Sequence, residues 1–186
     1  HFDRLVTESI AGGVNMIQLR EHNLRGGRLL KLALRVRELT EGKALFFVND
    51  RVDIALLSRA DGVQLGEESL KTSEVRRIAG NSLLIGKSVH SVDGAKSATV
   101  DGADFLIVGT VFKTQSHPEN DPAGPVIIAN IRDVTELPII AIGGVDKSNA
   151  RNIIDCGANG AAVITAISQH SNAKMAASTL MSKLAK

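Results

Sequence analysis

Small residues follow two neighbouring apolar runs near the end of the chain. The first run, residues 139–142, is followed by Gly143 and Gly144, and the second ends at Ile164 and Thr165. Apolar runs without polar alternation are typical of parallel strands buried on both faces. The loops after the last two strands of a (β/α)8 barrel bind phosphate through backbone N–H groups at a helix N-terminus. These residues therefore predict a site for a small phosphorylated ligand.

Polar side chains end two earlier apolar segments. Gln18 and Arg20 share one face of the first segment, because strand side chains alternate, and would offer an amide and a cation. Asn49 and Asp50 follow the second, where Asp50 is a candidate ligand for a divalent cation. Structural alternatives stay open: the arginine could pair with the adjacent glutamate, Asn49 could cap a helix, and Asp50 could pair with the following arginine.

Ser88 and His90 alternate at the end of residues 83–89, a pairing that suggests nucleophilic catalysis. No aspartate is placed to orient the histidine, and residues 90–93 are more typical of a helix start capped by Ser91. The interpretation as a capped helix start is favoured over nucleophilic catalysis. Further on, residues 109–125 form a long connection, which suggests either a lid whose hydroxyls grip phosphate or ordinary surface flexibility.

Strand-like and helix-like segments alternate along the chain, which predicts a parallel sheet with crossover helices. Seven strands are expected, at residues 14–19, 44–48, 62–65, 83–89, 105–108, 139–142 and 161–164. A recurring pattern of small and turn-forming residues leads into alternate strands, as paired units of a closed barrel would show, at residues 12–15, 60–63, 102–105 and 157–160. Counting back from the last strand makes residues 2–11 the first helix. The first strand of a (β/α)8 barrel is then missing from residues 1–186, which would form a single, N-terminally incomplete domain; a seven-stranded variant is the alternative.

Composition limits the partners. The 186 residues carry 22 basic and 20 acidic side chains, a formal net charge of +2, so no strong field favours nucleic acid or an acidic membrane surface. The single cysteine, Cys156, excludes an internal disulfide and suits a reducing cytoplasm. No apolar run is long enough for a membrane span. We expect a cytoplasmic protein without membrane or nucleic-acid partners, and homo-oligomerisation is left open.

Several segments, in order along nearly the whole chain, resemble the thiamin phosphate synthase superfamily, which also contains the TenI-like thiazole tautomerases. They are residues 18–21, 48–55, 60–66, 86–91, 102–104 with 109–112, and 141–145. The resemblance implies a (β/α)8 barrel. It also implies the synthase reaction, in which hydroxymethylpyrimidine diphosphate is joined to thiazole phosphate with Mg²⁺ and diphosphate is released.

The resemblance assigns site residues by position. It implies that Gln18, Arg20 and Asn49 contact the pyrimidine diphosphate, Asp50 binds Mg²⁺, Ser88 and Thr114 meet the pyrimidine or diphosphate, and Gly144, Ile164 and Thr165 hold the thiazole phosphate. Ser116, in the long connection, and Gly143 are further candidate contacts to the substrates.

Some positions depart from the synthase pattern. His22 and His117 stand where the synthase has lysines, and Ser69 stands where it has a metal-binding aspartate, while the thiazole phosphate end is unchanged. An imidazole is largely neutral at pH 7, so the diphosphate site would lose positive charge.

We therefore expect a TenI-like thiazole tautomerase that binds phosphorylated thiazole and needs no cofactor. Its candidate catalytic residues are His22, His117 and Arg20, because Thr110 stands where tautomerases carry a proton-transfer histidine. The alternatives are a Mg²⁺-dependent synthase and a non-catalytic regulatory protein that binds a thiamin precursor.

Overall fold

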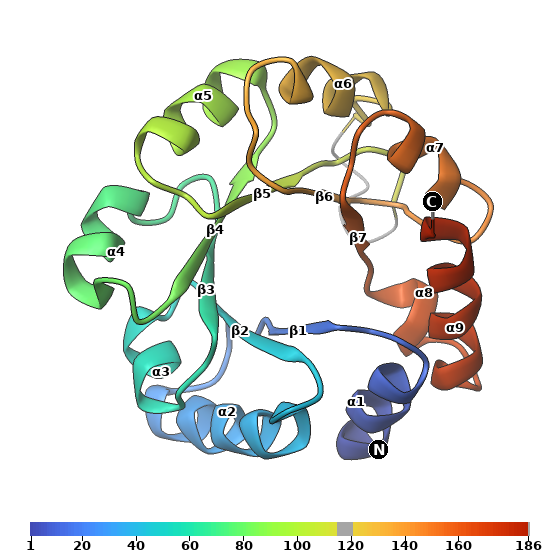
Figure 1. The fold of residues 1–186 in the computed structure, drawn as a ribbon. Coiled ribbons are helices and arrows are strands. Elements are labelled where there is room, and N and C mark those ends of the chain that lie inside the picture. The colour runs from blue at the N-terminus through green and yellow to red at the C-terminus, as the bar shows by residue number, and fades with distance from the viewer. Residues whose placement is uncertain (115–120, 186) are drawn as a thin grey trace.

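A computed structural model describes residues 1–114 and 121–185 of the chain (Figure 1). Seven parallel strands form one curled sheet whose order follows the sequence. They are β1 (Met16–Leu19), β2 (Leu45–Asn49), β3 (Gly62–Leu65), β4 (Leu84–Val89), β5 (Phe105–Val108), β6 (Ile139–Ile142) and β7 (Gly160–Ala162). Each lies within two residues of its predicted bounds, so the predicted barrel-like α/β fold is confirmed.

Helices lie outside the curled sheet, between successive strands and at both ends of the described chain (Figure 1). They are α1 (Phe2–Ala11), α2 (Gly26–Thr40), α3 (Val52–Leu57), α4 (Thr72–Ala79), α5 (Val92–Val100), α6 (Val126–Arg132), α7 (Ala150–Asp155), α8 (Thr165–Ser168) and α9 (Ala173–Leu184). None of these described helices has both the length and the apolar character needed to cross a membrane.

The described strands form an open curl whose edges are β1 and β7. Helices α1 and α9 pack side by side on this side of the molecule (Figure 1). Their contact depends on Gly12, where a Cβ would lie 2.4 Å from the carbonyl oxygen of Lys174. The first helix coincides with the predicted residues 2–11.

Aromatic rings fill the lower part of the barrel interior. Phe47 of β2 and Phe105 of β5 meet edge to face, with ring centroids 5.3 Å apart. Gly62 and Gly86 leave room for them, because a Cβ would lie 2.2 Å from the Phe47 ring at the first position and 2.3 Å from the Phe105 ring at the second. The interior is therefore packed at the level of these rings, below the carboxyl ends of the strands.

Polar clasps at the amino edge of the sheet account for three of the four copies of the recurring sequence pattern. In each clasp, a side-chain oxygen before one strand accepts hydrogen bonds from the backbone N–H of the preceding strand and from an arginine. The clasps are Asp61 with Phe46 and Arg37, Asp104 with Ile85 and Arg76, and Asn159 with Ile139 and Arg132. The pattern thus marks structural joints between strands, at the edge opposite to the predicted site.

Candidate active site

A chain of hydrogen bonds crosses the carboxyl ends of β1 and β2. The Nε2 of Gln18 donates to the Oδ1 of Asn49 at 2.9 Å, and the Nδ2 of Asn49 donates to the Oδ2 of Asp50 at 2.8 Å. The two strands are parallel neighbours, which brings these side chains to the same inner face. The side chain of Asn49 is therefore part of this chain of hydrogen bonds and does not cap α3.

The carboxylate of Asp50 lies at the centre of the arrangement. Its backbone has a φ of 55°, a left-handed conformation that Asp tolerates better than most residues. Its Oδ1 accepts from the backbone N–H of Gly66 at 3.0 Å and from the hydroxyl of Ser69. Arg51 pairs instead with Asp53 at 2.7 Å, so the alternative pairing with Asp50 is wrong.

Gln64, which is not among the predicted site residues, joins this inner face. Its Nε2 donates to the Oγ of Ser88 at 3.1 Å, and its side chain is buried. Its Oε1 has no hydrogen-bond partner in the described part of the protein. The alternation that singled out Gln18 applies equally to Gln64, a polar residue within the buried strand β3, and could have found it.

The pairing of Ser88 with His90 does not occur. The Nδ1 of His90 lies 2.7 Å from the Oε2 of Glu67, on an exposed part of the surface, while Ser88 is bonded to Gln64. Ser91 caps α5 as expected, since its Oγ accepts from the backbone N–H of Gly94 at 3.1 Å. The structural interpretation of this segment is confirmed.

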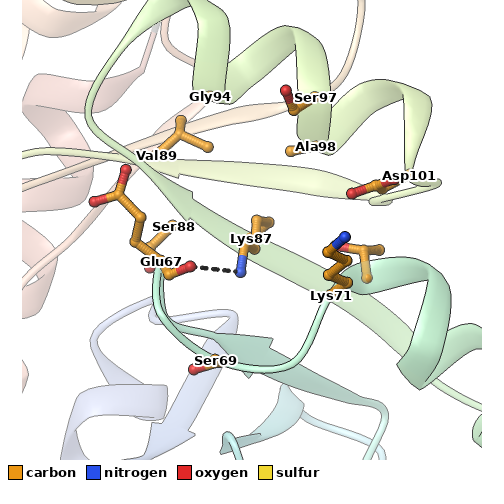
Figure 2. Close-up of a pocket in the computed structure, with 11 residues that line it drawn as sticks. Glu67, Ser69, Lys71, Lys87, Ser88, Val89, Gly94, Ser97, Ala98 and Asp101 are labelled. Carbon is orange, nitrogen blue, oxygen red and sulfur yellow. Dashed lines mark hydrogen bonds between the residues drawn. The ribbon is translucent and has the colours of Figure 1, made fainter.

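Residues 66–69, which follow β3, form a turn that is fastened to β4. The ammonium of Lys87 donates to the carbonyl oxygen of Gly66 at 2.6 Å. It also donates to the carbonyl oxygen of Glu67 at 3.1 Å (Figure 2). Burial lowers the pKa of the Lys87 ammonium, and the charges of Asp50, Glu67 and Asp101 oppose that shift. A partly desolvated cation therefore lies behind the turn that contacts Asp50.

A polar hollow of about 220 Å³ lies beside this turn, between the outer side of β4 and helices α4 and α5 (Figure 2). Glu67, Ser69, Lys71, Lys87 and Asp101 are among the residues that line it. The hollow thus shares Ser69 with the Asp50 site. It lies next to the barrel mouth and not in it, so it is distinct from the predicted phosphate site.

The glycine loop after β6 is held tightly. Gly143 and Gly144 have φ of 98° and 61°, and a Cβ on Gly144 would lie 2.4 Å from the carbonyl oxygen of Lys113. The backbone N–H of Phe112 donates to the carbonyl of Gly143 at 2.9 Å, and the Nδ2 of Asn149 donates to the carbonyl of Gly144 at 2.9 Å. These contacts hold the loop in one backbone conformation.

Ile164 and Thr165 follow the neighbouring strand. Ile142 of β6 pairs with Ala162 of β7, so the glycine loop and the start of α8 leave adjacent strands at the same edge. Ile164 and Thr165 are both exposed. The predicted phosphate residues are thus brought to adjacent strand ends, within reach of solvent.

The remaining predicted residues lie around the mouth. Arg20 and His22 are exposed, and within the described ranges neither has a hydrogen bond or ion pair, so the alternative pairing of Arg20 with Glu21 does not occur. Thr114 is partly exposed at the end of the described part of the long connection. Ser116 and His117 lie outside the described residues.

The residues around Asp50 fit a magnesium ion that is shared with a phosphorylated substrate. No group of three or more His, Cys, Asp or Glu side chains suited to a metal occurs in the described ranges. Mg²⁺, however, is commonly held by one or two carboxylates together with waters and substrate phosphates. Asp50 supplies one oriented carboxylate: its Oδ1 accepts two hydrogen bonds, whereas its Oδ2 accepts one and keeps a further lone pair for a cation.

Comparison with known proteins identifies a consistent set of relatives. A family model described as thiamine monophosphate synthase matches residues 1–167. A thiamine-phosphate synthase of Haloarcula marismortui is 40% identical over 185 residues, which cover 97% of this chain and 88% of the relative. The corresponding protein of Methanoculleus marisnigri is 41% identical over 177 residues, covering 94% and 84%.

Solved structures agree with these relatives. A thiamine phosphate pyrophosphorylase from Pyrococcus furiosus has a TM-score of 0.92 and 37% identity, with 98% of this chain and 88% of that chain covered. A 3-hexulose-6-phosphate synthase has a TM-score of 0.77 at 16% identity, a likeness that concerns the fold alone.

The expectation of a thiazole tautomerase is wrong. Relatives about 40% identical over most of the chain are named thiamine-phosphate synthases. The tautomerase prediction treated the loss of charge at His22, His117 and Ser69 as three independent losses of diphosphate or metal binding. In the structure the hydroxyl of Ser69 donates to Asp50, so Ser69 orients a carboxylate although it is not itself an aspartate. Arg20 remains an unpaired cation in the described part of the mouth.

Proposed function

This chain belongs to the thiamine monophosphate synthase family, and from that premise we propose that it is a thiamin phosphate synthase. The reaction joins hydroxymethylpyrimidine diphosphate to thiazole phosphate and releases diphosphate. The bond between the pyrimidine methylene and the diphosphate oxygen breaks, and a bond from that methylene to the thiazole nitrogen forms. The enzyme's tasks are to position two substrates and to stabilise the charge of the leaving group.

In this proposal the inner polar face binds the pyrimidine diphosphate. Gln18 and Asn49 hold each other in place at 2.9 Å, and Ser88 is oriented by Gln64, so the donors and acceptors are arranged before the substrate arrives. Arg20 is exposed and unpaired among the described residues, which leaves its guanidinium available for the diphosphate. His22, together with Ser116 and His117 beyond the described ranges, is a further candidate diphosphate contact.

Asp50 is the proposed magnesium ligand. When bound, Mg²⁺ would neutralise the negative charge that develops on the departing diphosphate. The protein's part is to hold the carboxylate at the end of β2 in one orientation, through Asn49, Gly66 and Ser69.

The thiazole phosphate is assigned to the opposite side of the mouth. Gly143 and Gly144 offer backbone groups that approach a ligand closely, and Thr165 adds a hydroxyl on the next strand end. Thr114 would contribute a hydroxyl from the long connection. The two substrates would thus meet above the packed interior.

The observation that carries the proposal is the oriented Asp50 carboxylate in a chain about 40% identical to thiamine-phosphate synthases over nearly its whole length. The test is an assay of the purified protein with both substrates and Mg²⁺, with thiamin phosphate and diphosphate measured separately. We expect equal amounts of the two products, and none when either substrate or Mg²⁺ is omitted. Diphosphate release without thiamin phosphate would contradict the proposal.

A further inference from the structure

Lys87 stands out because it is the cation behind the magnesium site and faces away from the barrel interior. Its neighbour Ser88 bonds Gln64 on the inner face, and strand side chains alternate, so Lys87 projects from the outer face of β4. Its ammonium is hydrogen-bonded to backbone carbonyls of the turn 66–69, so a role in the reaction would act through that turn.

The contacts of Lys87 are concentrated on a single turn. Its ammonium donates to two successive carbonyl oxygens, those of Gly66 at 2.6 Å and Glu67 at 3.1 Å; Figure 2 shows the second of these bonds. Leu65, the last residue of β3, pairs with Lys87 in the sheet. The lysine thus fixes the direction in which the chain leaves the strand.

The same turn supplies two of the donors that orient the Asp50 carboxylate. The backbone N–H of Gly66 and the hydroxyl of Ser69 both contact its Oδ1. Gly66 therefore receives a hydrogen bond from Lys87 on its carbonyl and gives one to Asp50 from its amide. A continuous path of hydrogen bonds joins the outer surface of β4 to the proposed magnesium ligand.

From this path we propose that Lys87 is a positioning residue, which holds the turn 66–69 so that Asp50 presents its carboxylate for Mg²⁺. The inference rests on the proposed synthase function for its kinetic consequence. The partial burial of the ammonium supports it, because a cation is withdrawn from water only where fixed acceptors replace its hydration. Groups behind a metal ligand commonly change metal affinity by about 10- to 100-fold when they are removed.

The first test does not depend on catalysis. Hydrogen exchange of the Gly66 amide is measured by NMR in the unaltered protein and in Lys87→Met. We expect exchange at Gly66 to accelerate by about tenfold, because its bond to Asp50 loses support. Lys71→Met is the matched control, since Lys71 lines the same hollow but its loss leaves both carbonyl contacts in place. Gly66 exchange within about twofold of the unaltered protein in Lys87→Met would overturn the proposal.

The second test separates positioning from general damage. In the synthase assay, Lys87→Met should raise the half-saturating Mg²⁺ concentration by about tenfold and leave the KM for thiazole phosphate within about twofold. Lys87→Arg keeps N–H donors and should recover most of the Mg²⁺ affinity. Equal effects of Lys87→Met and Lys71→Met on Mg²⁺ would contradict the inference.

Two outcomes keep this inference distinct from the proposed function. If Lys87→Met does not fold, Lys87→Leu, which also lacks N–H donors, replaces it in both tests, and unchanged Gly66 exchange in that variant would also overturn the proposal. If the unaltered protein makes no thiamin phosphate, the proposed function fails, and the exchange of Gly66 alone decides whether Lys87 holds the turn.

Discussion

The hydroxyl of Ser69 donates a hydrogen bond to the Oδ1 of Asp50, at the position where the family pattern has a second aspartate. One carboxylate and one hydroxyl thus occupy a site where the family pattern has two carboxylates. A hydroxyl orients the remaining carboxylate without adding negative charge. The Mg²⁺ affinity of this protein should therefore depend on the charge of the side chain at position 69.

Ser69→Asp and Ser69→Ala should change Mg²⁺ dependence in opposite directions. The aspartate adds a second oxygen ligand and should lower the half-saturating Mg²⁺ concentration, whereas alanine removes a donor from Asp50 and should raise it by about tenfold. The measurement is the rate of thiamin phosphate formation against Mg²⁺ concentration. Ser97→Ala, in the same hollow, is the control and should change nothing. Shifts of the same sign in both Ser69 variants would count against the arrangement.

Asn149 should matter for the thiazole phosphate through Gly144. Its Nδ2 donates to the Gly144 carbonyl, and its Oδ1 accepts from the backbone N–H of Asp146, at 2.9 Å in each case. Asn149→Ala removes both bonds, and we expect the KM for thiazole phosphate to rise by about tenfold, the equivalent of roughly one hydrogen bond. Asn152→Ala, on the exposed side of α7, is the matched control. An unchanged KM in Asn149→Ala would exclude this role.

The loop after β6 should also lose stability in acid. The hydroxyl and backbone N–H of Ser148 hold the pKa of Asp146 below its ordinary value of 3.8. Because the folded pKa is lowered, the ionised carboxylate stabilises the protein above pH 3.8, and this contribution disappears as the pH falls through the folded value. Thermal unfolding should show Asp146→Asn less stable than the unaltered protein at pH 7, with the difference shrinking below about pH 4. A difference that is constant with pH would be inconsistent with this explanation.

The clasp at Asp104 should contribute to stability and not to catalysis. Asp104→Ala leaves the backbone N–H of Ile85 without its acceptor and should cost about 1–3 kcal/mol of unfolding free energy. Asp104→Asn should cost less, because Asn159 performs the same function with an amide oxygen. Denaturant unfolding measures both variants. Equal losses in the two would indicate that the charge pair with Arg76, and not the bond to the strand, carries the effect.

Strand positions could be predicted from sequence because buried parallel strands are short, continuous apolar runs. The recurring pattern that contains Asp61 and Asp104 could also be found in the sequence, but its purpose could not, since the partner N–H groups lie 15 and 19 residues away along the chain. Alternation found Gln18 at the mouth and would have found Gln64 by the same rule.

The functional prediction failed where residues act together. His22 and Ser69 were each interpreted by their own charge, yet the contribution of Ser69 is a hydrogen bond to Asp50 that appears only when the turn after β3 folds beside the end of β2. The role of Lys87 is hidden for the same reason, because its contacts are to backbone carbonyls, which carry no signal in the sequence.

The most direct test of the account compares Asp50→Asn with Asp53→Asn in thiamin phosphate formation across a range of Mg²⁺ concentrations. Asp53 is an exposed carboxylate three residues away that pairs with Arg51, so its loss removes the same charge without touching the site. We expect Asp50→Asn to lower the rate at least about a hundredfold at any Mg²⁺ concentration, and Asp53→Asn to stay within about twofold. Comparable activity in Asp50→Asn and the unaltered protein would contradict the central claim that this carboxylate serves the synthase reaction.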